Sequence, residues 1–347
     1  MPTRVFTGLK PTGRLQLGNY LGAIRPILDL AADPGSDVLV CVADLHALTV
    51  DHDPARLRAL TRELATTLLA CGLDPRARLF VQSSVPAHTA LAYLLECTAT
   101  HGEMARMVQF REKSAGGESV RLSLLTYPAL MAADILAYDA EVVPVGEDQR
   151  QHLELTTTLA RRFNARYGDT FVVPRGTTPP ATARLKDLRD PRAKMGKTGS
   201  DGAGVVFLLD DPDTIAAKVR RAVTDAEPSQ SYDPAARPGV ANLAALLGAL
   251  TGCEPAIALD GLRGSGALKQ AVTDALVATL EPVRRRYAEL AAEPGQVDRV
   301  LEAGRDAVTP VAAATAGRAR EAMGLLGMGA RAGALGGPRP SLAQMST

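Results

Sequence analysis

Two glycine-containing segments, far apart in the chain, are the parts of the sequence most suited to holding a phosphate. The first spans residues 8–20, reads GLKPTGRLQLGNY, and directly follows a short apolar run. A glycine at the start of a helix lets a phosphate or a purine approach backbone N–H groups, and the helix dipole favours an anion there. A βα turn without a ligand also needs glycine, so this segment alone leaves both interpretations open.

The second segment is a polar loop at residues 194–198, with the sequence KMGKT. Lys194 and Lys197 bracket Gly196, so both ammonium groups can reach pyrophosphate oxygens and stabilise the charge that develops on them. A solvated surface loop would have a similar composition. The two segments together, rather than either one, indicate a site that handles phosphates.

These segments need elements to position them, and the first half of the chain predicts a parallel sheet wrapped by helices. Short apolar runs are typical of strands buried on both faces, at residues 5–7, 38–42, 79–82 and 142–145. Between them, apolar residues at three- and four-residue spacing predict helices at 17–31, 54–71, 87–101 and 149–167. The predicted fold class is therefore α/β, with a Rossmann-like parallel sheet.

The second half of the chain predicts helices alone. Amphipathic periodicity dominates at residues 211–223, 241–251, 268–280 and 297–308. Beyond residue 327 the composition turns to Gly, Ala and Pro, which cannot bury enough apolar surface to offset the entropy of ordering. We therefore expect a catalytic domain at 1–205, a helical domain at 206–327 and a flexible tail at 328–347.

Composition excludes some classes of protein. The formal net charge of the 347 residues is only +1, so charge alone does not suggest RNA, and a polyanion would have to bind local basic patches. No apolar run approaches the roughly 18 to 20 residues of a membrane span, and no basic-then-apolar leader opens the chain, so we expect a cytoplasmic protein with no membrane association. The cysteines are too widely spaced for a zinc site and are expected to pack in the core: Cys41, Cys71, Cys97 and Cys253.

The sequence resembles the tryptophanyl-tRNA synthetases, a class I aminoacyl-tRNA synthetase family. Residues 8–20 resemble the tryptophanyl version of the HIGH signature of class I, and residues 194–198 resemble the KMSKS loop. Between them, LLTYPALMAADIL at 124–136 and VPVGEDQRQH at 143–152 are similar to this family almost residue for residue, as are DLHA at 44–47 and VQFREKS at 108–114. The similarity runs from about residue 5 to about residue 323.

The resemblance implies a reaction of L-tryptophan with ATP and Mg²⁺, transfer to tRNA(Trp), an anticodon-binding role for the helical domain and a homodimer. It implies that Lys113, Lys194 and Lys197 stabilise the charge of the pentacovalent state and of the departing pyrophosphate. No protein-held metal is expected. The positions that it implies for ATP are Lys10, Pro11, Thr12, Gly18, Asn19, Gly146, Glu147, Asp148, Leu185, Lys194, Met195, Gly196, Lys197 and Thr198.

For tryptophan, the chemistry of the ring adds to the resemblance. An indole offers one N–H donor inside an apolar pocket, so it needs an acceptor at a fixed depth, and Asp134 in an otherwise apolar helical run is such a group. A helix-capping or ion-paired aspartate is the alternative. By similarity Tyr127 and Gln149 bind the α-amino group, while His46 and His152 line the pocket or pack in the core. The predicted tryptophan-binding residues are Phe6, Gly8, His46, Tyr127, Met131, Asp134, Val143, Val145 and Gln149.

Four positions depart from the family pattern. Gly196 and Thr198 stand where the loop signature has serines, and Gln16 stands where His or Thr is usual, but it can still donate a hydrogen bond. Lys10 stands where Gln is common in relatives, and a point charge there should alter how polar groups of the bound ligands are recognised. Our hypothesis is an auxiliary or inhibitor-tolerant synthetase; neutral drift, with Lys10 contacting a phosphate, is the alternative.

Three other functions stay open at this point. A tyrosyl-tRNA synthetase shares the fold, but the GEDQRQH run at 146–152 argues against it. A small-molecule adenylyltransferase would not need the helical half, and a non-catalytic paralogue that binds RNA or a protein would be expected to lose the loop lysines. For tRNA, residues 284–286 (RRR) and Lys269 are a candidate surface or simply a solvated face.

Overall fold

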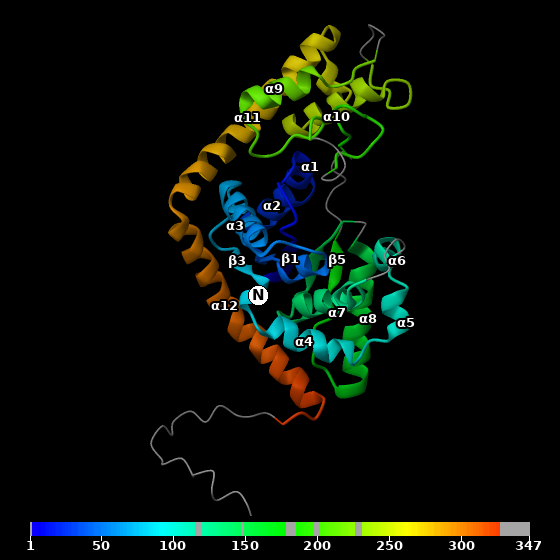
Figure 1. Cartoon of the computed structure of the whole chain (residues 1–347), viewed down its shortest axis with the longest axis vertical. Helices are drawn as coiled ribbons and strands as arrows, with labels where there is room; N and C mark the ends of the chain where they lie inside the picture. Colours follow the sequence, from blue (N-terminus) through cyan, green and yellow to red (C-terminus); the bar gives the residue numbers. More distant parts are fainter. Residues whose placement is uncertain are drawn as a thin grey trace, which may run out of the picture.

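A parallel sheet forms the centre of the molecule (Figure 1). The structure is a computed structural model that describes residues 2–114, 120–146, 149–177, 185–196, 202–225 and 231–326. Within these ranges the sheet has five strands, all parallel, in the order β3-β2-β1-β4-β5. The strands are β1 Thr3–Leu9, β2 Ser36–Val42, β3 Arg78–Val81, β4 Val142–Pro144 and β5 Arg175–Thr177. The predicted α/β fold with a parallel sheet is confirmed; β5 was not predicted, because its sequence RGT is short, polar and mostly exposed.

Helices cover both faces of the sheet. In β2, Val38, Val40 and Val42 belong to one hydrophobic cluster, whereas Leu39 and Cys41 belong to the other, as alternation along a strand requires. The first face carries α1 Leu17–Asn19, the π-helical turn η1 Tyr20–Ile24, α2 Arg25–Ala32 and α3 Pro54–Ala70. The second face carries α4 Ala87–Glu96, α7 Leu122–Leu136 and α8 Arg150–Tyr167, with the short helices α5 His101–Ala105 and α6 Val108–Ser114 beside them.

The helix predicted at 87–101 is shorter than expected. α4 ends at Glu96, and a new helix, α5, begins after Thr100. Thr100 and Glu103 form a capping box, in which each side chain bonds the backbone N–H of the other residue, and this arrangement starts a helix rather than continuing one.

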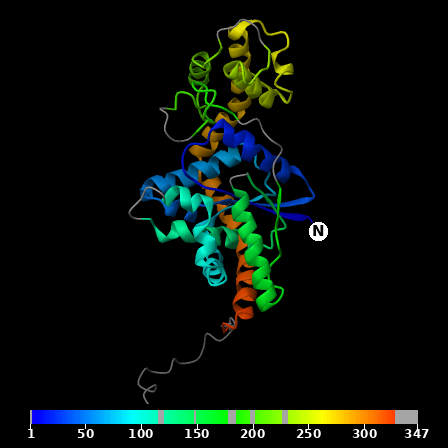
Figure 2. The same ribbon diagram turned by 90° about the vertical axis from the view of Figure 1, so that its right-hand side faces the viewer.

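The helical second half is confirmed, and the last helix of the described residues returns to the sheet (Figure 2). α9 Pro212–Arg220, α10 Pro238–Thr251 and the first part of α11 Gly264–Ala292 pack together at one end of the molecule. α12 Pro294–Ala322 then runs back along β3 and α4. Gly304 makes this contact possible, because a Cβ at that position would overlap the carbonyl oxygen of Leu79 in β3.

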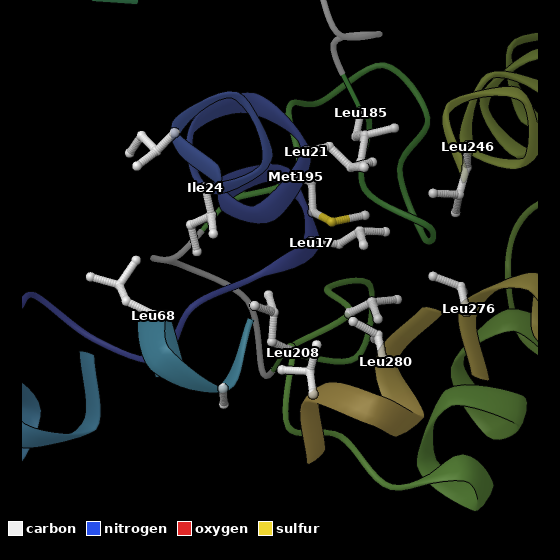
Figure 3. Packing of buried hydrophobic residues seen from close by; sticks show 14 of the residues in the cluster. Leu17, Leu21, Ile24, Leu68, Leu185, Met195, Leu208, Leu246, Leu276 and Leu280 are labelled. Atoms are coloured by element: carbon white, nitrogen blue, oxygen red, sulfur yellow. The ribbon is translucent and has the colours of Figure 1, made fainter. Parts of the chain in front are cut away.

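One hydrophobic cluster joins the two halves of the chain. Leu17 and Leu21 lie beside Met195 and face Leu246 of α10 and Leu276 of α11 (Figure 3). The hydrophobic packing is continuous across the predicted domain boundary at residue 205. That boundary therefore stays a proposal about function. The predicted tail at 328–347 lies outside the described residues.

The cysteines follow the expectation in part. All four are free, Cys41 is buried, and Cys71 and Cys253 are partly buried. Cys97 is exposed, so its assignment to the core was wrong; it is the C-terminal cap of α4, where the chain turns toward solvent. Among the described helices, none is long and apolar enough to cross a membrane.

Candidate active site

The predicted site residues gather at the carboxyl edge of the sheet. β2 and β4 flank β1, so the strand order reverses at β1, which is where parallel α/β sheets bind ligands. Gly8 at the end of β1 and Gly146 after β4 are both exposed, whereas the strand side chains of Phe6 and Val143 are buried. A Cβ on Gly8 would lie 3.8 Å from the Phe6 ring, which is ordinary contact, so the fold itself does not demand glycine there.

The two glycine-containing segments meet in space. The Gln16 side chain donates from Nε2 to the carbonyl oxygen of Met195 at 3.0 Å, across 179 residues of sequence. The backbone N–H of Leu17 donates to Val206 at 2.9 Å, and that of Leu208 donates to Leu15 at 3.0 Å. Of the predicted ATP-binding residues, Met195 is buried in this junction, Pro11 is buried elsewhere in the first segment, and Gly18 and Asn19 belong to α1.

The base of the loop at 194–198 is held by residues that the sequence did not single out. The backbone N–H of Met195 donates to Leu185 at 3.0 Å, and Lys186 pairs with Lys194 in an antiparallel bridge. Asn242 of α10 accepts from the N–H of Lys186 at 3.0 Å and donates to its carbonyl at 3.1 Å. A residue of the helical second half thus fixes the segment that pairs with the start of the loop. Lys194 is exposed and Gly196 partly exposed, while Lys197 and Thr198 lie outside the described residues.

Asp134 in α7 is buried and surrounded by donors. Its Oδ1 accepts from Gln82 Nε2 at 2.7 Å and from His88 Nδ1 at 2.6 Å, and its Oδ2 lies 2.7 Å from His46 Nε2. Burial alone would raise the pKa of this carboxyl, but the charges and hydrogen bonds of His46 and His88 outweigh burial and hold the pKa well below its usual range. Asp134 is therefore an ionised acceptor at neutral pH.

A second polar chain runs beside it. The hydroxyl of Tyr127 in α7 lies 2.6 Å from His152 Nε2 and 3.3 Å from Gln109 Oε1, and the same Gln109 oxygen accepts from Lys113 Nζ at 3.2 Å. Burial raises the pKa of Tyr127 to about 12, so this phenol stays protonated at neutral pH. The chain connects exposed Lys113 on α6 with the partly buried Tyr127.

The other predicted residues are placed by ring contacts, hydrogen bonds and packing of their own. The His46 and Tyr127 rings meet edge-on with centroids 6.1 Å apart, and His152 is buried against Tyr127, so both histidines contact predicted pocket residues. Lys10 lies 3.3 Å from Thr49 Oγ1. Met131 and Val145 are partly buried beside the second cluster. Gln149 precedes α8 and donates its N–H to Gly146 at 3.0 Å, whereas Glu147 and Asp148 lie outside the described residues.

The basic run at 284–286 is not a uniform solvated face. Arg284 points inward, donates to the carbonyl oxygen of Asp210 at 3.1 Å and pairs with Glu281. Arg286 pairs with Glu289 at 2.8 Å, and Lys269 donates to the carbonyl oxygen of Arg220 at 3.0 Å.

Sequence reasoning missed Gln82, His88, Tyr138 and Asn242. Gln82 and His88 follow β3 at the carboxyl edge, and two polar residues in a stretch with apolar neighbours are the one signal that could have pointed to them. Asn242 is a single amide in the otherwise apolar run at 238–250, which could have indicated a buried polar contact but not its partner.

Comparison with known proteins gives a consistent result. Residues 1–281 match the family model for class I tRNA synthetases (W and Y). The tryptophan–tRNA ligase 1 of Streptomyces coelicolor is 56% identical over 330 residues, which cover 93% of this chain and 98% of that protein.

Solved structures agree. The tryptophanyl-tRNA synthetase of Mycoplasma pneumoniae superposes with a TM-score of 0.84 at 34% identity, over 94% of this chain and 98% of that one. The enzyme of Campylobacter jejuni complexed with ADP and tryptophan superposes with a TM-score of 0.80 at 27% identity, over 93% of this chain and 100% of that one. The chain belongs to the class I aminoacyl-tRNA synthetases and, within them, to the bacterial tryptophanyl-tRNA synthetase family.

Proposed function

We propose that this protein activates L-tryptophan with ATP, forming tryptophanyl-AMP and pyrophosphate, and then transfers the aminoacyl group to the terminal adenosine of tRNA(Trp). The observation that carries the proposal is the ionised Asp134, which is buried and contacts Gln82 and His46, two residues that follow β3 and β2 at the carboxyl edge of the sheet. Resemblance to class I favours the 2′-OH as the acceptor of the aminoacyl group.

The acceptor explains the choice of amino acid. Oδ2 of Asp134 has one partner, His46, among the described residues, which leaves one acceptor position for an indole N–H. Phenylalanine has no ring donor, and the hydroxyl donor of tyrosine lies at a different depth. A site built around a buried acceptor rejects analogues that leave it unpaired by large factors.

Activation itself needs little acid–base chemistry. The carboxylate of tryptophan attacks the α-phosphorus of ATP, a new P–O bond forms, and the bond to pyrophosphate breaks. The protein positions the two substrates and supplies positive charge from Lys113, Lys194 and Lys197. A hard cation such as Mg²⁺ prefers several oxygen ligands, and the described residues contain no group of three or more acidic, His or Cys side chains that could hold one. We therefore propose that Mg²⁺ arrives on the phosphates of ATP.

The wider setting is also part of the proposal. We infer a cytoplasmic homodimer in which residues 1–205 carry the reaction and the helical residues 206–327 recognise the anticodon side of the tRNA. The exposed Arg285 and Arg286 of α11 are candidates for the second role. A non-catalytic paralogue is not favoured, since Lys194 and the Asp134 site are both present.

The direct test is ATP–pyrophosphate exchange with tryptophan, tyrosine and phenylalanine in parallel, with Lys197→Ala as a variant. We expect exchange with tryptophan alone, and a loss of at least about tenfold in the variant, because a charge-assisted bond to the departing pyrophosphate disappears. Exchange with tyrosine would indicate the tyrosyl alternative. No exchange with any amino acid would contradict the enzymatic function.

Lys10 provides a separate prediction. Its ammonium group bonds Thr49 Oγ1, and Thr49 in turn donates to the carbonyl oxygen of His46 at 2.9 Å, so the charge sits beside the segment that carries a pocket histidine. We expect Lys10→Gln to increase inhibition by indole-based tryptophan analogues about tenfold, as one added hydrogen bond from an amide would.

The measurement for Lys10 is the inhibitor concentration that halves exchange, with Lys10→Met as a control that removes the charge without adding an amide. Equal inhibition of wild type and Lys10→Gln would contradict the hypothesis of an inhibitor-tolerant form. Stronger inhibition of Lys10→Gln than of Lys10→Met would assign the effect to the amide.

A further inference from the structure

We propose that His88 and Tyr138 are positioning residues that set the preference for an indole N–H, by fixing which oxygen of Asp134 is available to the substrate. The inference rests on the proposed function. Both side chains are fully buried, and both act through Asp134 or Phe6 rather than from an exposed position at the site.

The orientation of the Gln82 amide is fixed by its own partners. The backbone N–H of Leu45 donates to Gln82 Oε1 at 3.0 Å, so Nε2 must be the atom that faces Asp134. Gln82 Nε2 and His88 Nδ1 both donate to Oδ1 of Asp134, at 2.7 and 2.6 Å. Two donors fill the two lone pairs of Oδ1, and the substrate is left with Oδ2.

The partners of His88 likewise fix the orientation of its ring. An ionised carboxylate only accepts, so Nδ1 of His88 carries a proton. His88 Nε2 lies 2.7 Å from the Tyr138 hydroxyl, so Tyr138 holds the far side of the imidazole ring by a hydrogen bond. Burial raises the pKa of Tyr138 far above its usual range, so this phenol stays protonated at neutral pH.

Tyr138 is held in place by aromatic packing. Its ring stacks on Phe6, with centroids 5.8 Å apart and planes inclined by 17°, and meets Phe80 edge-on with centroids 5.5 Å apart. Phe6 is itself a predicted wall of the tryptophan pocket. The wall and the acceptor for the indole are therefore fixed by one and the same tyrosine.

This arrangement favours discrimination more than affinity. A carboxylate that can rotate finds another donor or a water when the substrate has no N–H, and then tolerates such a substrate. A carboxylate held at Oδ1 by two buried donors leaves Oδ2 unpaired in that case, which is unfavourable. Variants that loosen the support of Asp134 should therefore raise kcat/KM for an analogue without an N–H, relative to kcat/KM for tryptophan.

The test compares L-tryptophan with β-(3-benzothienyl)-L-alanine, in which sulfur replaces the ring N–H, by kcat/KM in pyrophosphate exchange. Tyr138→Phe removes only the hydroxyl and keeps the ring that packs on Phe6. We expect the preference for tryptophan to fall about tenfold in Tyr138→Phe, the effect of one buried hydrogen bond. His88→Leu should reduce it further, and His88→Asn, whose Nδ2 can replace the lost donor, should recover part of it.

Tyr167→Phe is the matched control, because Tyr167 at the end of α8 packs on Phe163 and lies outside both polar chains. It should leave the preference unchanged. An equal loss with both substrates in Tyr138→Phe would overturn the inference, and this variant decides the matter even if His88→Leu fails to fold. If the wild-type protein shows no exchange with tryptophan, the proposed function fails instead, so the two failures are distinguishable.

Discussion

We expect Asp134→Asn to lower kcat/KM for L-tryptophan by about two to three orders of magnitude, while the KM for ATP changes little. Gln82, His88 and His46 all point donors at the carboxylate. The amide of an asparagine has its own N–H donors, so it would place a donor against one of these three donors. It also removes the negative charge, and breaking a buried charged pair typically costs about 3–5 kcal/mol. Pyrophosphate exchange at varied tryptophan and ATP concentrations measures both effects.

Stability provides an independent check on the same variant. The pKa of Asp134 is depressed in the folded state, so its carboxylate stabilises the fold at pH values above about 4, and this contribution is lost as pH falls further. The difference in free energy of unfolding between wild type and Asp134→Asn should therefore shrink between pH 7 and pH 3.

For the activity of Asp134→Asn, a kcat/KM for tryptophan within threefold of the wild-type value would contradict the prediction. It would show that Asp134 is only a structural ion-pair partner.

We expect Gly204→Ala to lower kcat/KM for ATP while tryptophan still binds. A Cβ on Gly204 would overlap the carboxylate of Asp187, which accepts from the N–H groups of Arg189 at 2.7 Å and Asp190 at 3.2 Å. Gly204 also accepts from Leu188 N–H at 2.9 Å, so neither segment can move without loosening the turn. Its φ is not positive, and the requirement for glycine is therefore one of space alone.

The turn at Asp187 supports the arm of the loop that carries Lys194, so its distortion misplaces the loop by the order of 1 Å or more. Misplacement of this size lowers rates about a hundredfold. We expect kcat/KM for ATP to fall by that factor, with an unchanged Kd for tryptophan. The chain contains no Trp, so the fluorescence of the bound amino acid reports binding without background from tryptophan in the protein. Gly317→Ala in α12 is the matched control, because nothing lies within 4 Å of its Cβ position; a normal rate for ATP in Gly204→Ala would contradict the argument.

The sequence predicted the parts of this fold that depend on local pattern. Buried parallel strands are continuous apolar runs, so four of the five described strands were found, whereas the polar β5 was not. The break before α5 was visible in principle, since Thr100 and Glu103 have the spacing of a capping box. The two segments predicted to bind phosphate were singled out by residue type, and the structure brings them together through Gln16 and Met195.

The support of the site was beyond the reach of the sequence. Asp134, His88, Gln82 and Tyr138 come from α7, α4, the turn after β3 and the segment after α7, and only the tertiary fold makes them neighbours. Asn242 lies in an apolar helix, and its contact with Lys186 spans 56 residues. Hydrophobic periodicity carries no information about such pairs, because it reports which face is buried and not what the face meets.

The return of α12 to the sheet has a consequence for synthesis of the protein. β3 is an edge strand, and α12 crosses it at the backbone of Leu79 and completes the second hydrophobic cluster with Val308, Ala312 and Ala319. A nascent chain therefore exposes the β3 edge until almost the whole described sequence has left the ribosome. At about 5–20 residues per second, this interval is on the order of ten to fifty seconds, during which an uncovered strand edge can pair with another chain. Among the described elements α12 is thus the last one to cover the sheet, and a chain truncated before Pro294 should aggregate rather than yield a smaller enzyme.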